Sequence, residues 1–259
     1  MLKVYEHPFS PYAQKVKIAL YEKNIPFDLE VPQAFAGGAT EYGKTNPRLE
    51  VPALVADGFP IFDSTIILQY IEDRWPEPAM LPKSPQDRAR VRMIEELCDT
   101  YYEPINWGLM EVTAWGRASG ELAATIVARA KEQTAGVFAW LERELGSRPY
   151  FNGDAFGYGD LSVYPFVRGS IVFGNAPRAG SPLAAWAGRV EGRESVRKTI
   201  EAAAQFVGGI EMLKEMLKSG LFKRQYRDHR LEWMMRVGGS DIVRDGLANG
   251  SIRFSQEIS

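Results

Sequence analysis

Residues 51–64 read VPALVADGFPIFDS, and this stretch decides the fold. Two short apolar runs, Pro52–Ala56 and Phe59–Phe62, flank Asp57-Gly58. Asp-Gly between two such runs is a strong signal for a tight hairpin of antiparallel strands. The stretch ends on Ser64, which can cap a following helix whose apolar residues recur at helical spacing. The sequence therefore predicts a β-β-α unit here.

The residues before this unit predict the other half of a small domain. Leu2–His7 and Phe27–Val31 have strand patterns, and Pro11–Lys23 has a helical pattern between them. A crossover helix implies that the strands it joins are parallel, whereas the hairpin supplies an antiparallel pair. With an irregular or weakly helical stretch around Gly37-Gly38, the predicted order is β-α-β-α-β-β-α in a mixed four-stranded sheet.

Beyond Pro76–Pro85 the strand signals fade and helical patterns replace them. We expect an α/β domain over residues 1–80, an all-helical domain over 86–206 and a C-terminal extension over 207–259. The segments of the second domain with helical spacing of apolar residues are Asp87–Tyr102, Leu122–Leu145, Tyr158–Phe166, Leu183–Val190 and Ser195–Phe206.

The C-terminal extension has weaker patterns. Ile210–Lys218 predicts a short amphipathic helix and Phe222–Val237 predicts another, after which glycines, Gly246 among them, break the chain into pieces. One interpretation is a tail packed on the helical domain, and the other is a lid over a ligand site.

Composition excludes several functional classes. The chain has 259 residues, 31 basic and 33 acidic, for a formal net charge of −2, which gives no electrostatic case for nucleic acid or an anionic membrane. No stretch reaches the roughly 18 to 20 apolar residues of a membrane helix, and no secretory signal opens the chain. Cys98 has no partner for a disulfide, and His7 and His229 are too far apart in sequence to indicate a zinc site. We expect a soluble, cytoplasmic protein without a metal.

The first domain contains features that suit one ligand if the fold brings them together. Ser10-Pro11 lies at a strand-to-helix junction, where free N–H groups and the helix dipole favour a thiolate over a thiol. Val51-Pro52 opens the third strand, and a cis bond there would turn the Val51 backbone outward to pair with an extended peptide. Asp63-Ser64 can hold the ammonium and carboxylate of an amino-acid end. Each dipeptide alone is more simply a cap or a strand start, but the combination is far more specific.

With these residues the sequence resembles the cytosolic glutathione transferase superfamily, over about residues 1–206. The matching segments are HPFSPYAQKVKIAL (7–20), NPRLEVPALVADGFPIFDSTIILQYIEDRWPEP (46–78) and the region around FGYGDLSVYP (156–165). The resemblance implies a thioredoxin-like first domain that binds glutathione as co-substrate, and an all-helical second domain that supplies much of the electrophile pocket. It further implies a twofold homodimer.

By position, the resemblance gives each feature a role toward glutathione. Ser10 corresponds to the residue that hydrogen-bonds the thiolate. Val51, with Pro52 in cis, corresponds to the strand that pairs with the cysteinyl backbone. Asp63 and Ser64 correspond to the pair that holds the γ-glutamyl end.

Several positions depart from the family pattern or stay open. SPYAQ (10–14) is similar to the CPFAQ-type segment of omega-like members, but its serine cannot form the mixed disulfide that their cysteine forms. Asp160 resembles the aspartate of a helix capping box in which Gly157 replaces the usual serine or threonine. Lys44 and Arg48 are candidates for the glycyl carboxylate. A tyrosine, Tyr5 or Tyr12, is the alternative to Ser10.

Aromatic side chains between the two domains favour a small hydrophobic, aromatic electrophile, although aromatics at helical spacing also build cores. The candidates are Phe9, Tyr12, Tyr101, Tyr102, Trp107 and Trp115. The expected activity is that of a glutathione transferase, in which the thiolate attacks an electrophilic carbon, as in detoxification.

Other functions of the same fold stay open. One is a bacterial β-etherase that uses glutathione to cleave aryl ethers. A maleyl-type isomerase would need a basic pocket, and the only basic cluster is in the extension, at Lys223, Arg224, Arg227 and Arg230. A binding or assembly module without turnover is the third, since fold alone does not establish chemistry.

Overall fold

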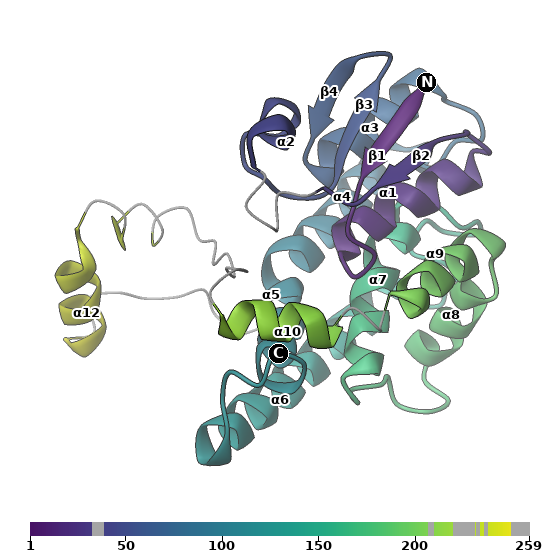
Figure 1. Cartoon of the computed structure of the whole chain (residues 1–259). Coiled ribbons are helices and arrows are strands. Elements are labelled where there is room, and N and C mark those ends of the chain that lie inside the picture. Colours follow the sequence, from purple (N-terminus) through teal and green to yellow (C-terminus); the bar gives the residue numbers. More distant parts are fainter. Residues whose placement is uncertain (33–38, 207–209, 220–230, 232–233, 236–237, 250–259) are drawn as a thin grey trace.

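The predicted hairpin forms around a two-residue turn (Figure 1). The structure is a computed structural model that describes residues 1–32, 39–206, 210–219, 231, 234–235 and 238–249. In it β3 (Ala53–Ala56) pairs antiparallel with β4 (Phe59–Phe62). Asp57 and Gly58 between them have φ of 51° and 88°. Positive φ at both central residues belongs to a type I′ turn, whose twist matches that of paired strands.

The sheet has the mixed topology that the sequence predicts. Its order is β2-β1-β3-β4, with β1 (Leu2–Tyr5) parallel to β2 (Asp28–Glu30) and antiparallel to β3. The crossover between β1 and β2 is α1 (Pro11–Glu22). Because β4 is antiparallel to β3, it runs in the same direction as β1. The predicted β-α-β-α-β-β-α order and four-stranded sheet are confirmed.

Two helices pack on this sheet through their apolar stripes. α1 contributes Val16 and Leu20, and α3 (Ser64–Arg74) contributes Ile67 and Ile71, to a core that also contains Leu2, Val4, Leu54 and Ile61 of the strands. The short helix α2 (Ala39–Thr45) lies beside β4 (Figure 1).

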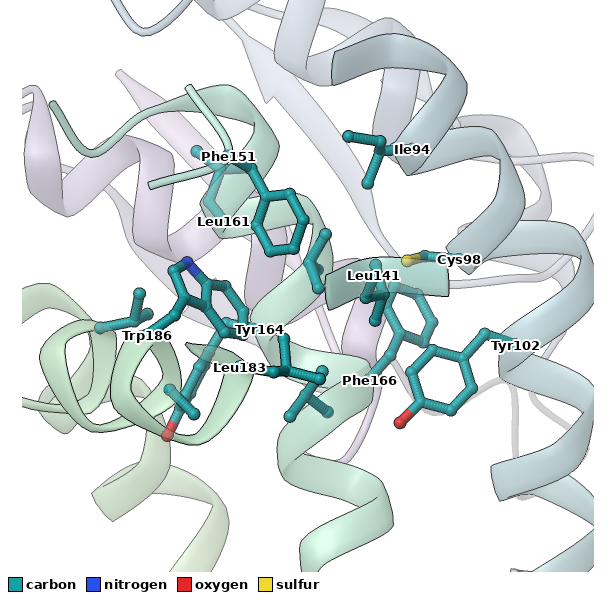
Figure 2. Close-up of a cluster of buried hydrophobic side chains, with 14 of the residues drawn as sticks. Ile94, Cys98, Tyr102, Leu141, Phe151, Leu161, Tyr164, Phe166, Leu183 and Trp186 are labelled. Carbon is teal, nitrogen blue, oxygen red and sulfur yellow. The ribbon is translucent and has the colours of Figure 1, made fainter. Parts of the chain in front are cut away.

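The helical second domain is built around α7 (Tyr158–Val172), most of whose residues are buried. Figure 2 shows Phe166 of this helix together with Trp186 and Tyr102 from other helices, and all three side chains are almost fully buried. The other elements are α4 (Pro85–Leu97), η2 (Cys98–Tyr102), α5 (Glu103–Thr113), α6 (Gly120–Leu145), α8 (Pro182–Glu191) and α9 (Glu194–Gln205).

One helix differs from the prediction. The spacing predicted a single helix over Asp87–Tyr102, whereas α4 widens into the π-helical turn η2 and continues as α5. Pro104, in the first turn of α5, has no N–H and cannot continue the hydrogen-bond pattern of α4. The same proline is well suited to the start of a new helix, which was the overlooked signal for α5.

The start of α7 explains why a glycine replaces serine or threonine in its capping box. Asp160 Oδ2 accepts from the Gly157 N–H at 3.0 Å, as a capping aspartate does. A Cβ on Gly157 would lie 2.0 Å from Asn152 Nδ2 and 2.4 Å from the Met80 carbonyl oxygen, so no side chain fits. Asn152 Oδ1 instead accepts from the Gly159 N–H at 3.2 Å. The cap acceptor therefore comes from a neighbouring loop.

The C-terminal extension is described in part. α10 (Ile210–Lys218) is the helix that the sequence predicts. α12 (Ser240–Ala248) forms where the glycines predicted breaks, and Gly246 lies inside it. Most of the predicted helix over 222–237 lies outside the described residues, as do the basic residues at 223–230. Within the described ranges no helix has the length and apolar character needed to cross a membrane. The limits 1–80, 86–206 and 207–259 stay predictions.

Candidate active site

The topology brings the three predicted ligand-binding features to one edge of the sheet. Across that edge Tyr5 pairs with Ala53, and Ala53 pairs with Phe62. β1 and β4 end at this edge and β3, which runs the opposite way, begins there. The loop before α1, the start of β3 and the start of α3 therefore meet. Ser10 thus becomes a neighbour of Val51 and Asp63, which follow it far along the sequence.

Ser10 is the N-cap of α1. Its Oγ accepts from the Ala13 N–H at 3.3 Å, and its own N–H donates to the His7 carbonyl oxygen at 2.8 Å. The first turn of α1 carries no acidic residue, so no side chain of that turn offsets the positive end of the helix dipole. Capping uses a lone pair of the hydroxyl and leaves its proton to donate. Ser10 can therefore cap the helix and hydrogen-bond an anion at the same time.

The Val51-Pro52 peptide bond is cis, and β3 starts directly after it. The preceding carbonyl is fixed, because the Glu50 oxygen accepts from the Tyr42 hydroxyl and from Asn46 Nδ2. No hydrogen bond between the residues that the structure describes uses the Val51 N–H or carbonyl oxygen. Both groups are available to an extended ligand, which is the fit that a peptide-like molecule needs.

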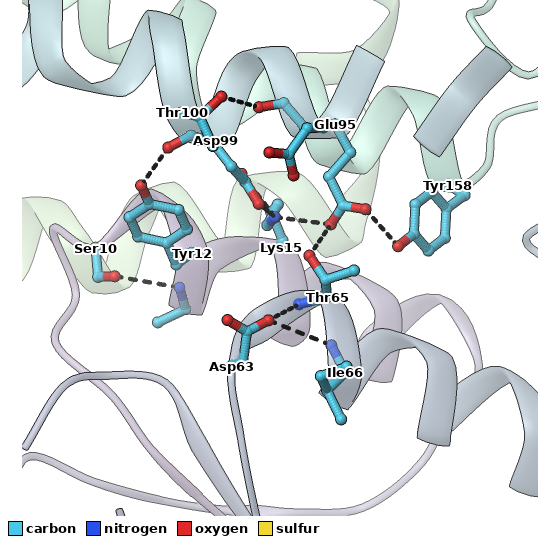
Figure 3. A network of polar contacts seen from close by, with 12 residues as sticks. Ser10, Tyr12, Lys15, Asp63, Thr65, Ile66, Glu95, Asp99, Thr100 and Tyr158 are labelled. Carbon is cyan, nitrogen blue, oxygen red and sulfur yellow. Dashed lines mark hydrogen bonds and ion pairs between the residues drawn. The ribbon is translucent and has the colours of Figure 1, made fainter. Parts of the chain in front are cut away.

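Asp63 is the N-cap of α3 and has a left-handed φ of 77°. Its Oδ1 accepts from the Thr65 and Ile66 N–H groups at 3.1 and 3.5 Å, and its Oδ2 lies 3.6 Å from Arg48 Nη1. Ser64 follows at the first position of the helix and is 5% exposed. A half-buried carboxylate beside a helix N-terminus offers one group for a cation and N–H donors for an anion. Figure 3 shows Ser10 and Asp63 at the starts of neighbouring helices.

Below this edge, a buried ion cluster consists of Lys15, Glu95 and Asp99 (Figure 3). Lys15 Nζ lies 2.8 Å from Glu95 Oε1 and 2.8 and 2.7 Å from the two Asp99 oxygens, and Lys15 is 0% exposed. Glu95 also accepts from Thr65 Oγ1 at 3.1 Å and from the Tyr158 hydroxyl at 2.5 Å. The cluster thus joins α1 and α3 of the first domain to α4, η2 and α7 of the second. The starts of both site helices are tied to one segment, Glu95–Asp99.

Burial raises the pKa of Asp99 to about 6, although the nearby Lys15 ammonium group lowers this pKa. Asp99→Asn is expected to remove a pH dependence of stability. Since the native pKa exceeds 3.8, the ordinary value of an aspartate, the native state binds this proton more tightly than the unfolded chain. The resulting stabilisation is fully present below pH 3.8 and is lost as the pH rises through 6.

Urea unfolding of both proteins at two pH values measures this effect. Between about pH 5 and about pH 7.5, the wild-type protein should lose about 1.4 kcal/mol of stability relative to Asp99→Asn. A stability difference that stays constant, or that shifts in favour of the wild-type protein as the pH rises, contradicts the assignment.

The structure divides the aromatic candidates for the electrophile pocket. Phe9, Tyr101 and Trp107 are half-buried, whereas Trp115 is 7% exposed. Tyr102 is 0% exposed, and its hydroxyl donates to Ser170 Oγ at 2.6 Å inside the core of the second domain. A side chain with no exposed surface cannot line a pocket, so Tyr102 is a core residue. Phe9, Tyr101 and Trp107 remain the proposed lining.

Sequence reasoning missed an aromatic group at the loop before Ser10. The Phe206 ring, directly after α9, lies 5.0 Å from the His7 ring and 5.7 Å from the Phe9 ring. His7 Nδ1 accepts from the Phe9 N–H at 3.3 Å, which makes this nitrogen the unprotonated one. The signal that could have indicated this group is Phe206, an aromatic residue at the end of the mostly polar helix α9. The end of α9 therefore lies beside the loop that precedes Ser10.

The tyrosine alternatives to Ser10 have other contacts. The Tyr12 hydroxyl donates to the Asp99 carbonyl oxygen at 2.8 Å. The Tyr5 ring lies 5.1 Å from the Tyr42 ring. The Tyr12 contact engages its hydroxyl, whereas the Tyr5 contact involves its ring and not its hydroxyl.

The other titratable candidates are also engaged. Lys44 is exposed and pairs with Glu41 at 2.7 Å, and Arg48 pairs with Glu50 at 2.9 Å. Cys98 is 0% exposed, and burial raises the pKa of its thiol well above the usual value, so it is a small apolar core residue. In the described part of the chain, no group of three His, Cys, Asp or Glu side chains is placed to hold a metal ion.

Two family models, several known proteins and several solved structures match this chain. The family described as "Glutathione S-transferase, N-terminal domain" matches residues 4–79, and "Glutathione S-transferase, C-terminal domain" matches residues 124–189. Glutathione S-transferase U28 of Arabidopsis thaliana is 30% identical over 215 residues, which cover 80% of this chain and 92% of that protein. The tau-class glutathione S-transferase of mango, Mangifera indica, is 27% identical with a TM-score of 0.65, over 81% of this chain and 98% of that one. Rice GST1, solved in complex with glutathione, is 27% identical with a TM-score of 0.68, over 83% and 96%.

Proposed function

The chain belongs to the glutathione S-transferase family, and we propose that it transfers glutathione to a small hydrophobic, aromatic electrophile with Ser10 as the thiolate-binding residue. The observation that carries the proposal is the shared sheet edge. There the Ser10 hydroxyl, the Val51 backbone beside cis-Pro52 and the Asp63 carboxylate at a helix start come from three separate segments, and no hydrogen bond among the described residues uses the Val51 N–H or carbonyl oxygen. These groups complement a thiol, a peptide backbone and an amino-acid end, which glutathione combines in one molecule.

In this proposal each group has one task. Val51 pairs with the cysteinyl backbone beside cis-Pro52. Asp63 holds the α-ammonium, while the hydroxyl and the N–H of Ser64 hold the α-carboxylate. The Ser10 hydroxyl donates a hydrogen bond to the sulfur, and the α1 dipole favours the thiolate over the thiol. Glutathione supplies the nucleophile: its sulfur forms a bond to an electrophilic carbon, and the leaving group departs with the bonding electrons. The protein lowers the barrier by positioning the reactants and stabilising the anion.

Phe9, Tyr101 and Trp107 would receive the electrophile between the two domains. The family resemblance also supports a cytoplasmic homodimer that acts in detoxification, and these finer points are part of the proposal. Two assays test the function itself: retention on immobilised glutathione, and turnover of glutathione with an aryl halide and with an aryl ether. Conjugation of the aryl halide is expected. Turnover of the ether alone would indicate a β-etherase, and retention without any turnover would indicate a binding module.

Asp63→Asn is expected to raise the KM for glutathione by about tenfold with little change in kcat, because one charge-assisted contact is lost. Asparagine is as good an N-cap as aspartate and tolerates a positive φ, so the substitution removes the charge and keeps the helix start. Asp73→Asn, at an exposed position of the same helix, is the matched control. Equal KM values for Asp63→Asn and the wild-type protein would remove Asp63 from the glutathione site.

A further inference from the structure

The π-helical turn η2 leaves the backbone carbonyl of Asp99 without a helical partner. In an α-helix this oxygen would accept from the Glu103 N–H, but that N–H donates to the Cys98 carbonyl, one residue earlier. In a continuing π-helix it would accept from residue 104, which is proline and has no N–H. Two features of the sequence thus combine to leave one carbonyl free.

Tyr12 uses that carbonyl. Its hydroxyl donates to the Asp99 oxygen at 2.8 Å, across the boundary between the two domains. Figure 3 shows the Tyr12 ring extending from α1 to the backbone of η2. Tyr12 lies two residues after Ser10 in the first turn of α1, and Asp99 lies two residues before Tyr101. The bond therefore connects the backbone at the thiolate site with the backbone that carries the proposed wall of the electrophile pocket.

We propose that Tyr12 is a positioning residue whose hydrogen bond to the Asp99 carbonyl, made possible by Pro104, fixes Ser10 relative to Tyr101 and Trp107. The inference rests on the proposed transferase function and deepens it. The Tyr12 hydroxyl donates its hydrogen bond to a carbonyl oxygen. Tyr12 is therefore not the residue that donates a hydrogen bond to the thiolate. Its effect is on the distance between sulfur and electrophile, to which reaction rates are sensitive.

Two substitutions break the bond from opposite sides. Tyr12→Phe removes the donor, and Pro104→Ala supplies an N–H that allows a regular helical pattern and turns the Asp99 carbonyl into the helix. Each is expected to lower kcat with an aryl halide by about tenfold, while the affinity for glutathione and the pKa of its bound thiol stay unchanged. The double variant should be no slower than either single variant, because both remove the same bond. Leu122→Ala, at an exposed position of α6, is a control for general effects.

The outcomes separate this inference from the function on which it rests. Wild-type kcat in Tyr12→Phe, or fully additive losses in the double variant, overturns the positioning role while leaving the transferase proposal intact. A raised pKa of the bound thiol in Tyr12→Phe also overturns the positioning role, since Tyr12 would then be the residue that donates a hydrogen bond to the thiolate. Absence of turnover and of glutathione binding in the wild-type protein would contradict the transferase proposal itself.

Discussion

Replacing Ser10 by alanine is expected to lower kcat/KM for glutathione conjugation by roughly 10- to 1,000-fold, the range for losing one donor to a reacting anion. The substitution removes the hydroxyl that donates to the sulfur and leaves the α1 dipole in place. Steady-state kinetics with glutathione and an aryl halide measure the effect. The loss should appear mainly in kcat, because the backbone contacts that bind the peptide remain.

The same substitution removes a helix cap, and the chain contains a matched control for that loss. Ser181 precedes a proline, caps α8 and accepts from the Ala184 N–H at 3.2 Å, against 3.3 Å for the corresponding contact of Ser10. Ser181→Ala should cost about 1 kcal/mol of stability, as an average cap does, and leave kcat/KM unchanged. Similar activity losses in Ser10→Ala and Ser181→Ala would reduce Ser10 to a capping residue.

Lys15→Met is expected to lower the free energy of unfolding by about 3–5 kcal/mol. The variant keeps the length of the side chain but leaves Glu95 and Asp99 buried together without a cation. Two carboxylates in that position repel each other, and removal of one partner from a buried pair costs far more than the pair contributes. Urea unfolding followed by circular dichroism measures the change, provided that unfolding is two-state.

A surface lysine provides the comparison. Lys44 pairs with Glu41 at 2.7 Å, almost the same distance as in the buried cluster, but both side chains are more than 70% exposed. Lys44→Met should therefore change stability by less than about 1 kcal/mol. A comparable small effect for Lys15→Met would mean that the two carboxylates gain protons or water at little cost, contrary to a structural role for the ion cluster.

The two strand pairs were predictable because local signals set them. Asp57-Gly58 specified the hairpin, and the helix between the first two strands specified a parallel pair. Neither signal specified how the two pairs join, and the antiparallel pairing of β1 with β3 is what puts the ends of β1 and β4 and the start of β3 at one edge. The Ser-Pro motif does not by itself identify the active site, because three such pairs begin helices in the same way: Ser10-Pro11, Ser84-Pro85 and Ser181-Pro182. Topology, and not the dipeptide, singles out Ser10.

The ion cluster was not predictable from spacing. Lysine side chains are almost always exposed, yet Lys15, Lys17 and Lys23 are 0%, 0% and 7% exposed. The sheet covers one side of α1 and the second domain covers another, so lysines on different sides of the helix are buried. Each lysine meets a carboxylate from another segment: Glu95 and Asp99 for Lys15, Glu6 for Lys17, and Glu72 for Lys23. Partners of this kind depend on tertiary contacts that no local pattern encodes.

Tyr102 illustrates the same limit for the electrophile pocket. The family resemblance made it a pocket candidate together with Tyr101. Adjacent residues on a helix point in different directions, and only the packing of η2 against α7 decides which one is buried. Pro104 was visible in the sequence, although its consequence depends on how α4 meets α5.

The most direct measurement is the ionisation of bound glutathione, followed by the ultraviolet absorbance of its thiolate as the pH is varied. With the wild-type protein the thiol should titrate well below the pKa of about 8.5 of a free thiol, and with Ser10→Ala its pKa should move back toward that value. Bound glutathione that titrates like the free tripeptide in the wild-type protein, or identically in both proteins, would contradict the assignment of Ser10 and the start of α1 as the thiolate site.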